Sequence, residues 1–373
     1  MSTPLETELL ARIEERGPLP FAAYMSLALY HTRHGYYTGG PERVGWRGHY
    51  LTSPELDPAF GELWGRAFEQ FWRAVGSPDD FSVVEIGPGE GGFAAGVLEG
   101  AGPAFRRALR YVAIERSPAA ERRQRERLDT FDVAWHRDVS ELSPIENGCI
   151  FANEVLDNLP VHLLQKVGGR WLEVCVGSAE GRLETVLLEP SNPTLVSFAQ
   201  EMATRVPEGH RIEVPLSTPA LIKRLAHFLG RGALVFVDYG ASADDLVSRP
   251  RGSITCYSDT GVDEDFLARP GEKDITCHAN WSVVSRACRD AGLTVTGPLS
   301  QRTVLQQLGL REVDSELRRE HDAAVASGRG VDAVRALSRR QALGALADPQ
   351  GLGALGVLVA LKGIQPPSFM TDH

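Results

Sequence analysis

A glycine-rich stretch, VVEIGPGEGGF at residues 83–93, contains the residue types that bind a nucleoside-containing cofactor. Read as Gly87-x-Gly89-x-x-Gly92, it matches the fingerprint of a dinucleotide site. Read as Gly87-x-Gly89-x-Gly91 after an acidic residue, it matches the nucleotide loop of a methyltransferase. Glycines after a strand let the backbone approach a ligand closely, and the next helix N-terminus favours an anionic group. The glycines alone therefore do not separate NAD from S-adenosylmethionine.

Three acidic residues near this stretch help to distinguish NAD from S-adenosylmethionine as the cofactor. Glu115 ends the apolar run RYVAIE, 24 residues after Gly91 (115 − 91), where a carboxylate can accept the hydrogen bonds of a ribose in either cofactor. Glu85 stands inside an apolar run, where an ionised carboxylate is costly unless it meets polar groups. The ammonium group of S-adenosylmethionine would meet it, whereas a pyrophosphate would be repelled. Asp138 either recognises adenine or caps the helix that follows it.

Short apolar runs that alternate with helical segments must position these residues. The runs are FSVVEIG (81–87), RYVAIE (110–115), FDVAWHRD (131–138), GCIFANE (148–154) and GALVFVDYG (232–240). This alternation predicts an α/β fold with a mostly parallel, Rossmann-like sheet. Two late runs, at 293–301 and 354–362, predict an antiparallel pair at one edge. A reversed terminal strand is typical of a class I methyltransferase, whereas a dehydrogenase usually repeats its βαβ halves.

The changes of pattern along the chain predict two domains. Residues 1–78 are expected to form an N-terminal cap over the donor site, with a helix that begins at a Thr3 and Glu6 capping box and with loops between residues 20 and 60. Residues 79–373 are expected to form the methyltransferase core. Its predicted insertions are β-hairpins at about 161–215, a loop at 241–280 and helices at 301–350.

Composition excludes several classes of function. The 373 residues include 39 basic and 49 acidic ones, a net charge of −10 that offers no electrostatic footprint for nucleic acid. Five widely spaced cysteines without a C-x-x-C pair predict buried free thiols and no metal site. The longest apolar run, at 351–361, is too short for a membrane span, which needs about 20 residues. The N-terminus has no signal-peptide pattern, so a cytoplasmic location is expected; a homodimer stays open.

Seven segments in a characteristic order resemble one known family. They are GPLPFAAYMSLALYHTRHGYY, YLTSPELDPAFGELWG, VVEIGPGEGGF, IFANEVLDNLPVHLLQ, LVFVDYG, RGSITCY and PGEKDITCHANW. Their order resembles that of the MidA-like family, which contains the mitochondrial complex I assembly methyltransferase, a protein arginine methyltransferase. The resemblance extends from about residue 19 to residue 363. It implies a class I methyltransferase that uses S-adenosyl-L-methionine as donor and releases S-adenosyl-L-homocysteine.

The resemblance also implies a set of cofactor-binding residues. The donor loop would consist of Glu85, Gly87, Pro88, Gly89 and Gly91, with Glu115 as the ribose ligand. Thr52 and Ser53 open a T-S-P-E segment that resembles a lid over the methionine end of the donor. Asn153, which opens an N-E-x-x-D-x-L-P segment, and Asp138 complete the predicted donor site.

The acceptor side is predicted to use Glu154, Asp157 and His278. If NEVLDN opens a helix, the two carboxylates share one face, where they could bind and polarise a guanidinium. The alternative is that Asn153 caps that helix and Asp157 is solvated. His278 could take a proton from a hydroxyl or amine, since its ordinary pKa is about 6.5, or could be a structural histidine bonded to a loop carbonyl.

Four segments of the chain depart from the usual family pattern. Gly48-His49-Tyr50 replaces Gly-Asp-Phe, Asp57-Pro58 replaces Ser-Gln, Asn158 replaces the alanine of Asp-Ala-Leu-Pro, and His278-Ala279-Asn280-Trp281 replaces His-Val-Asp-Phe. The donor loop is intact while acceptor positions have changed. The sequence therefore predicts methyl transfer to N or O of an acceptor that is either a protein arginine or a small metabolite. The alternatives are a nicotinamide-dependent oxidoreductase and a non-catalytic, donor-binding assembly factor.

Overall fold

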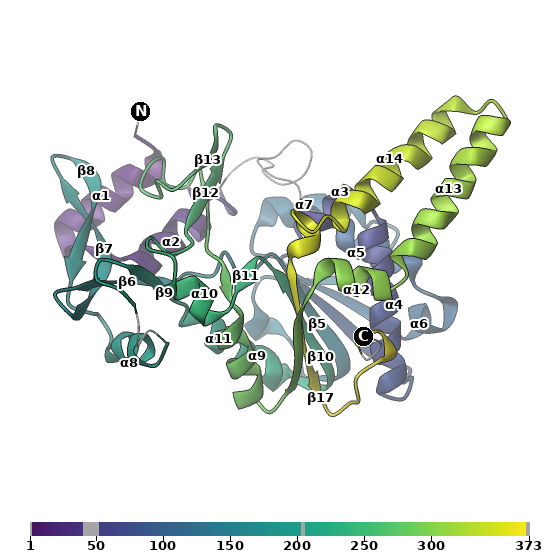
Figure 1. The fold of residues 1–373 in the computed structure, drawn as a ribbon, viewed down its shortest axis with the longest axis horizontal. Helices are drawn as coiled ribbons and strands as arrows, with labels where there is room; N and C mark the ends of the chain where they lie inside the picture. The colour runs from purple at the N-terminus through teal and green to yellow at the C-terminus, as the bar shows by residue number, and fades with distance from the viewer. Residues whose placement is uncertain (1, 40–51, 203–205, 371–373) are drawn as a thin grey trace. The chain divides into compact units, whose positions relative to one another are not determined.

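The chain forms two compact units in the computed structural model, which describes residues 2–39, 52–202 and 206–370 (Figure 1). We call Val44–Glu154, Arg224–Tyr239 and Cys288–His373 the α/β unit. We call Met1–Arg43, Val155–Lys223 and Gly240–Ala287 the antiparallel unit. Each unit draws on three segments of the chain, so the units do not coincide with the predicted division at residue 78, which stays a prediction.

The α/β unit contains a seven-stranded sheet in the order β16-β17-β10-β5-β2-β3-β4. Its strands are β2 (Phe81–Ile86), β3 (Leu109–Ile114), β4 (Val133–His136), β5 (Ile145–Asn153), β10 (Leu229–Asp238), β16 (Thr294–Ser300) and β17 (Gly356–Lys362). Strands β10, β5, β2, β3 and β4 run parallel, and β17 is antiparallel to both of its neighbours. This arrangement confirms the predicted α/β class and the reversed terminal strand. The chain order reverses around β2, where open α/β sheets bind their ligands.

Helices cover the sheet of the α/β unit because its central strands are apolar on both sides. Strand β10 is buried at every residue from Gly232 to Asp238, and only Gly230 and Arg231 of this strand are exposed. Helices α4 and α12 contact the sheet, and α5 packs on α4. The helices of this unit are α3 (Ser53–Leu56), α4 (Ala59–Ala74), α5 (Gly92–Gly100), α6 (Pro103–Ala108), α7 (Pro118–Arg127), α12 (Gln301–Gln307), α13 (Leu310–Ala326) and α14 (Gly330–Leu346).

The predicted helical insertion near the C-terminus is a hairpin of α13 and α14 (Figure 1). A turn at Gly328, whose φ of 68° lies in the left-handed region, separates the two helices. Arg340 on α14 donates to Asp314 on α13 at 2.8 Å, and alanines and leucines of both helices are buried between them.

The antiparallel unit contains a five-stranded sheet, β1-β7-β6-β9 with β8 paired to β7. The strands are β1 (Leu19–Pro20), β6 (His162–Val167), β7 (Arg170–Ala179), β8 (Arg182–Leu188) and β9 (Arg211–Val214). Two-residue turns at Gly168-Gly169 and Glu180-Gly181, all with positive φ, join β6 to β7 and β7 to β8. The β-hairpins predicted within residues 161–215 are therefore confirmed.

Helices α1 (Pro4–Arg16) and α2 (Phe21–Tyr30) share one core with this sheet, and α8 (Pro193–Met202) shares another. The capping box predicted at Thr3 and Glu6 is present. The expectation of loops from residue 20 onward is wrong for residues 21–30. Because α2 has apolar residues on nearly every side, its sequence lacks the amphipathic period by which a surface helix is recognised, although its burial is one-sided.

The segment predicted as a loop at 241–280 contains short elements. They are β11 (Gly240–Ala241), α10 (Ala243–Val247), β12 (Thr255–Ser258), β13 (Gly261–Asp263), β14 (Asp274–Thr276) and β15 (Ala279–Asn280). β12 pairs with β13 and β14, and β11 pairs with β15. Helices α9 (Ser217–Phe228) and α11 (Trp281–Asp290) each contain residues of both units.

All five cysteines are buried and free, as predicted. Among the described residues, no group of three His, Cys, Asp or Glu side chains could hold a metal ion. Over the same residues, every helix is too short or too polar to cross a membrane.

Candidate functional site

The glycine-rich loop follows β2 and leads into α5. Gly87, Gly89 and Gly91 have φ angles of 67°, 56° and 80°, which L-residues with a side chain rarely adopt. A turn in which Gly91 N–H donates to Pro88 O at 2.8 Å closes the loop. A Cβ added to Gly89 would meet no atom within 4 Å, so this glycine borders open space. The loop therefore has the left-handed backbone, with open space at Gly89, that a donor cradle needs.

Gly92 has a different role from the other glycines. A Cβ at this position would lie 2.6 Å from Glu55 Oε1 and 2.9 Å from Pro54 O. The T-S-P-E segment thus lies directly against the start of α5, and Gly92 allows that contact. Arg127 of α7 strengthens it, because its Nη1 donates to Glu55 Oε2 at 3.1 Å.

The two predicted lid residues differ in their surroundings. Thr52 is half-buried and precedes α3. Ser53 is fully buried, and its Oγ accepts a hydrogen bond of 3.1 Å from Gln301 Nε2. The hydroxyl of Ser53 therefore joins α3 to α12, while its role toward the donor stays a prediction.

Glu85 is buried on β2, and its partner is a tyrosine. Tyr111 OH on β3 donates to Glu85 Oε2 at 2.6 Å. Burial raises the pKa of Glu85 to about 8, although the Tyr111 bond opposes the shift and the charges of Glu55 and Glu115 add to it. Without a cation nearby, this carboxyl group is mostly protonated at neutral pH. A bound ammonium group would favour its ionised form.

Glu115 lies at the end of β3, half-buried, with both carboxylate oxygens held. Oε1 accepts from Ser117 N–H at 2.7 Å, and Oε2 accepts from Gln124 Nε2 at 3.0 Å. Burial raises its pKa, and these two bonds oppose the rise. A carboxylate offers about four lone-pair positions, so two remain for ribose hydroxyls. Gln124, which also donates to Gly89 O at 2.8 Å, was missed because it lies in the uniformly polar sequence RRQRER.

Asp138 serves as a cap, which was one of the two roles expected for it. Its Oδ1 accepts from Ser140 N–H at 2.9 Å at the start of a 3₁₀ turn, Val139–Glu141. Arg116 and Arg224 also pair with its two oxygens, at 3.2 and 2.8 Å. The hydrogen bonds from Ser140 are the main cause that lowers its pKa. Adenine recognition by Asp138 stays a prediction.

Asn153, at the carboxyl end of β5, holds a buried acceptor atom. Its Nδ2 donates to Glu154 Oε1 at 3.0 Å, while its Oδ1 has no hydrogen-bond partner among the described residues. A buried polar atom of this kind is costly unless a ligand or water uses it. Open space beside Gly89, two free positions on Glu115 and this acceptor together fit a nucleoside-containing amino-acid cofactor.

The helix that NEVLDN would need to open for its two carboxylates to share one face is absent. Glu154 has a φ of 53°, its N–H donates to Val237 O at 2.8 Å, and residues 154–159 form bends and turns. The left-handed backbone at Glu154 ends the strand before a helix can begin, so helical spacing does not bring Glu154 and Asp157 onto one face. Glu154 belongs to the α/β unit, and Asp157 is buried in the antiparallel unit, where Cys277 N–H donates to Asp157 O at 2.9 Å.

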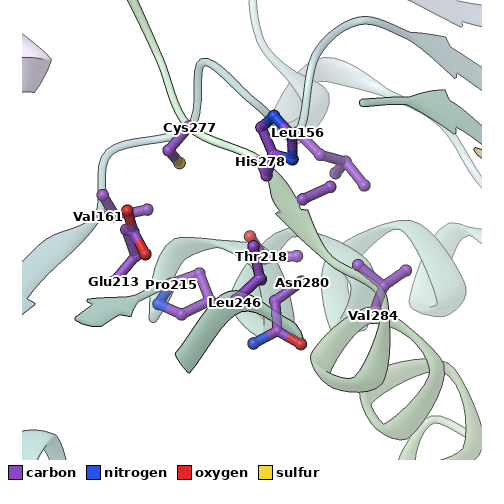
Figure 2. Close-up of a pocket in the computed structure, with 11 residues that line it drawn as sticks. Leu156, Val161, Glu213, Pro215, Thr218, Leu246, Cys277, His278, Asn280 and Val284 are labelled. Atoms are coloured by element: carbon purple, nitrogen blue, oxygen red, sulfur yellow. The ribbon is translucent and has the colours of Figure 1, made fainter. Parts of the chain in front are cut away.

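His278 lines a pocket of the antiparallel unit. Figure 2 shows Cys277 and His278 along one side of this pocket and Thr218, Leu246 and Asn280 along the other. Arg249 Nη1 lies 3.2 Å from His278 Nδ1. A guanidinium can only donate, so Nδ1 accepts and the neutral ring carries its proton on Nε2. Burial, with the charge of Arg249, lowers the pKa of His278. This geometry suits a hydrogen-bond donor better than the general base expected from the sequence.

Two of the four departures from the family pattern are used in internal contacts. Asp57 forms a two-bond ion pair with Arg339 on α14, with both distances 3.1 Å, and accepts from Ala59 N–H at 2.9 Å. Asn158 Nδ2 donates to Asp274 Oδ1 at 2.9 Å. Tyr37 OH lies 2.8 Å from Asp274 Oδ2 and 3.0 Å from Asn158 Oδ1.

These two changes therefore have structural roles, which weakens them as signs of a changed acceptor. Gly48-His49-Tyr50 lies outside the described residues.

The fold and the donor loop define the class: an α/β methyltransferase with a reversed strand and a glycine cradle at its switch point. A family model described as "Putative S-adenosyl-L-methionine-dependent methyltransferase" matches residues 63–299, which is more than half of the chain. The chain belongs to this family, and the MidA-like resemblance is confirmed. Its cofactor is S-adenosylmethionine. This result excludes the alternative of a nicotinamide-dependent oxidoreductase. In agreement with it, Gly92 allows close packing of the T-S-P-E segment and is not needed for a dinucleotide.

Several relatives are similar over most of their length. Protein arginine methyltransferase NDUFAF7 homolog, mitochondrial, of Drosophila melanogaster is 28% identical over 336 residues, covering 82% of this chain and 74% of that protein. Protein arginine methyltransferase NDUFAF7, mitochondrial, of Mus musculus is 28% identical over 342 residues, covering 83% and 74%. A Burkholderia thailandensis crystal structure bound to S-adenosyl-homocysteine has a TM-score of 0.88 and 27% identity, covering 99% of this chain and 94% of that one.

Proposed function

We propose that this methyltransferase transfers the methyl group to a nitrogen of a guanidinium-bearing acceptor. Bound S-adenosylmethionine supplies an electrophilic methyl group on a sulfonium. The protein must then bind, orient and shield the two substrates and manage the proton of the acceptor. The observation that carries the choice of a guanidinium is the buried carboxylate of Asp157, because a guanidinium is a charge-assisted hydrogen-bond partner for a carboxylate.

The predicted acceptor residues are consistent with a cationic nitrogen. Methylation of a guanidinium nitrogen releases one proton, and the Asp157 carboxylate that holds the guanidinium can accept it as the nitrogen attacks the methyl group. His278 in its observed state does not offer a free lone pair for this proton. Asp157 is a carboxylate, a group that binds and polarises a guanidinium through charge-assisted hydrogen bonds. The matched relatives, which are named protein arginine methyltransferases, support the same acceptor group. We assign to Asp157 the role of orienting the guanidinium, and the role of Glu154 toward the acceptor stays a prediction from the sequence.

The donor residues have separable roles in this proposal. Gly87, Gly89 and Gly91 let the backbone reach the nucleoside, and Glu115 holds the ribose. Glu85 faces the ammonium group, and Asn153 Oδ1 accepts a hydrogen bond from the donor. Thr52 and Ser53 belong to the segment that covers it. A cytoplasmic location and the absence of a nucleic-acid partner stay predictions, and a homodimer stays open.

The test is a product analysis with radiolabelled S-adenosylmethionine. The protein is incubated with arginine-containing peptides, free guanidino compounds and phenol or catechol acceptors, and products are separated by hydrolysis and mass spectrometry. Label on a guanidino nitrogen supports the proposal, and the peptide and free compounds distinguish a protein from a metabolite acceptor. Label on oxygen alone would overturn the choice of nitrogen. The Asp157→Asn variant, which retains the donor residues, serves as the matched control.

A further inference from the structure

Gln124 is an unusual residue for its helix. Its side chain is fully buried, while α7 around it carries the charged sequence ERRQRER. Burial of an amide is unfavourable unless its hydrogen-bonding groups find partners. The position therefore requires an explanation in terms of the groups that the amide contacts.

Three hydrogen bonds define the orientation of this amide. Nε2 donates to Gly89 O at 2.8 Å and to Glu115 Oε2 at 3.0 Å, and Oε1 accepts from Trp135 Nε1 at 3.1 Å. An indole N–H can only donate, so the amide oxygen must face Trp135 and the amide nitrogen must face the other two groups. The amide cannot flip without the loss of all three bonds.

The two groups on the nitrogen side belong to separate parts of the donor site. Gly89 is in the loop after β2, and Glu115 is at the end of β3. Gln124 also packs beneath the loop, because a Cβ on Gly91 would lie 3.6 Å from it. Its neighbour Arg123 adds a two-bond ion pair with Glu90, at 2.6 and 2.7 Å. Helix α7 thus holds the loop from outside.

We propose that Gln124 is a positioning residue for the donor: its amide sets the spacing and orientation of the Glu115 carboxylate relative to the Gly89 carbonyl, so that the ribose hydroxyls meet Glu115 while the nucleoside rests on the loop. This inference rests on the proposed donor site. Gln124 acts through Glu115 and the loop. Trp135 completes the arrangement by holding the amide oxygen.

The experiment measures how strongly binding depends on the ribose hydroxyls. Calorimetry gives the Kd of S-adenosylhomocysteine and of its 2′,3′-dideoxy analogue for the wild type and for Gln124→Met, which retains size without hydrogen bonds. We expect Gln124→Met to weaken S-adenosylhomocysteine about tenfold, the scale of one or two lost hydrogen bonds. The dideoxy analogue should bind to Gln124→Met with the same Kd as to the wild type. The ratio of the Kd of the analogue to the Kd of S-adenosylhomocysteine should therefore be smaller for the variant.

Three further variants keep the test falsifiable. Gln124→Glu retains the shape, and we expect a larger loss for S-adenosylhomocysteine because the new carboxylate faces Glu115. Trp135→Phe removes the indole N–H and should give a smaller loss of the same kind. Arg122→Met, an exposed change on the same helix, should leave both Kd values unchanged. Melting temperatures of all variants without ligand report any loss of folding.

Two outcomes would overturn the inference. Equal weakening of both ligands by Gln124→Met would indicate general damage to the fold, and an unchanged Kd for S-adenosylhomocysteine would show that Gln124 has no effect on the donor. If the wild type itself failed to bind S-adenosylhomocysteine, the proposed function would fail instead. The wild-type measurement therefore separates the two failures.

Discussion

The two units hold their candidate functional residues by different means. In the α/β unit, the candidate donor loop and Glu115 follow the carboxyl ends of the parallel strands β2 and β3, and the backbone of the loop glycines would form the donor cradle. In the antiparallel unit, Asp157 lies on a turn and His278 lies between β14 and β15. Side-chain hydrogen bonds of Asn158, Asp274 and Arg249 hold these segments in place. The difference teaches that a site built from backbone can be recognised in a sequence, whereas a site built from long-range side-chain contacts cannot.

Gly87→Val should give the largest effect, because it attacks the backbone cradle. A valine at a φ of 67° is strained, and its side chain would occupy the nucleoside's place. We expect S-adenosylhomocysteine binding to weaken more than about 1,000-fold, about 4 kcal/mol, when measured by calorimetry.

The matched control is Gly168→Val in the antiparallel unit. Gly168 has a similar φ of 59°, and a Cβ there would meet no atom within 4 Å. This variant should lose stability and retain donor affinity. Donor binding of normal strength in Gly87→Val would contradict the assignment of the donor site to the glycine loop of the α/β unit.

Glu85→Gln tests the buried carboxyl group of the α/β unit. Its folded-state pKa of about 8 lies above the ordinary 4.5, so the folded state retains a proton that the unfolded state releases between these values. The contribution of the protonated Glu85 carboxyl group to the unfolding free energy is complete below about pH 4.5 and is lost as the pH rises through 8. We expect the unfolding free energy of the ligand-free wild type to fall by a few kcal/mol more than that of the variant between pH 5 and pH 9.

Urea unfolding at several pH values measures this difference. Parallel pH profiles for the two proteins would show that Glu85 is ionised in the folded state, contrary to the shift that its burial causes.

Asp157→Asn tests the candidate acceptor residue of the antiparallel unit. If Asp157 orients a cationic acceptor, its loss should reduce kcat/KM for a guanidinium substrate about 10- to 100-fold, or about 1.4–2.7 kcal/mol. The Kd of S-adenosylhomocysteine should not change, because the donor residues are in the α/β unit. Steady-state kinetics with calorimetry check both parts. A weakened donor with normal turnover would contradict the assignment.

Asn158→Ala should give the smallest effect. It removes the bonds to Asp274 and Tyr37 and restores the residue that the family commonly has. We expect a loss of about 1–2 kcal/mol in unfolding free energy, a fall of a few-fold in kcat and no change in donor affinity. Tyr37→Phe, which removes one hydroxyl from the same network, should reproduce part of the stability loss. An unchanged stability in both variants would show that this network contributes nothing to the fold.

The predictions from sequence succeeded where the signal is local. The five parallel strands, the late antiparallel pair and the Thr3 capping box follow from residue patterns of a few positions. Helix α2 was missed because apolar residues occupy nearly every side of it, so its sequence shows no amphipathic period. The helix expected at NEVLDN failed because the bond from Glu154 N–H to Val237 O joins residues 83 positions apart (237 − 154) and fixes a left-handed backbone.

The sequence by itself determined the class of protein: the strand order, the spacing of Gly87, Gly89 and Gly91, and the family motifs were sufficient for a methyltransferase that uses S-adenosylmethionine. Only the tertiary structure decided what individual side chains contact. It placed Ser53 against Gln301, paired Asp57 with Arg339, placed Arg249 against Nδ1 of His278 and brought Gln124 beneath the glycine-rich loop. The physical reason is that backbone conformation is encoded by neighbouring residues, whereas a hydrogen-bond partner is selected by packing among elements that are distant in the chain.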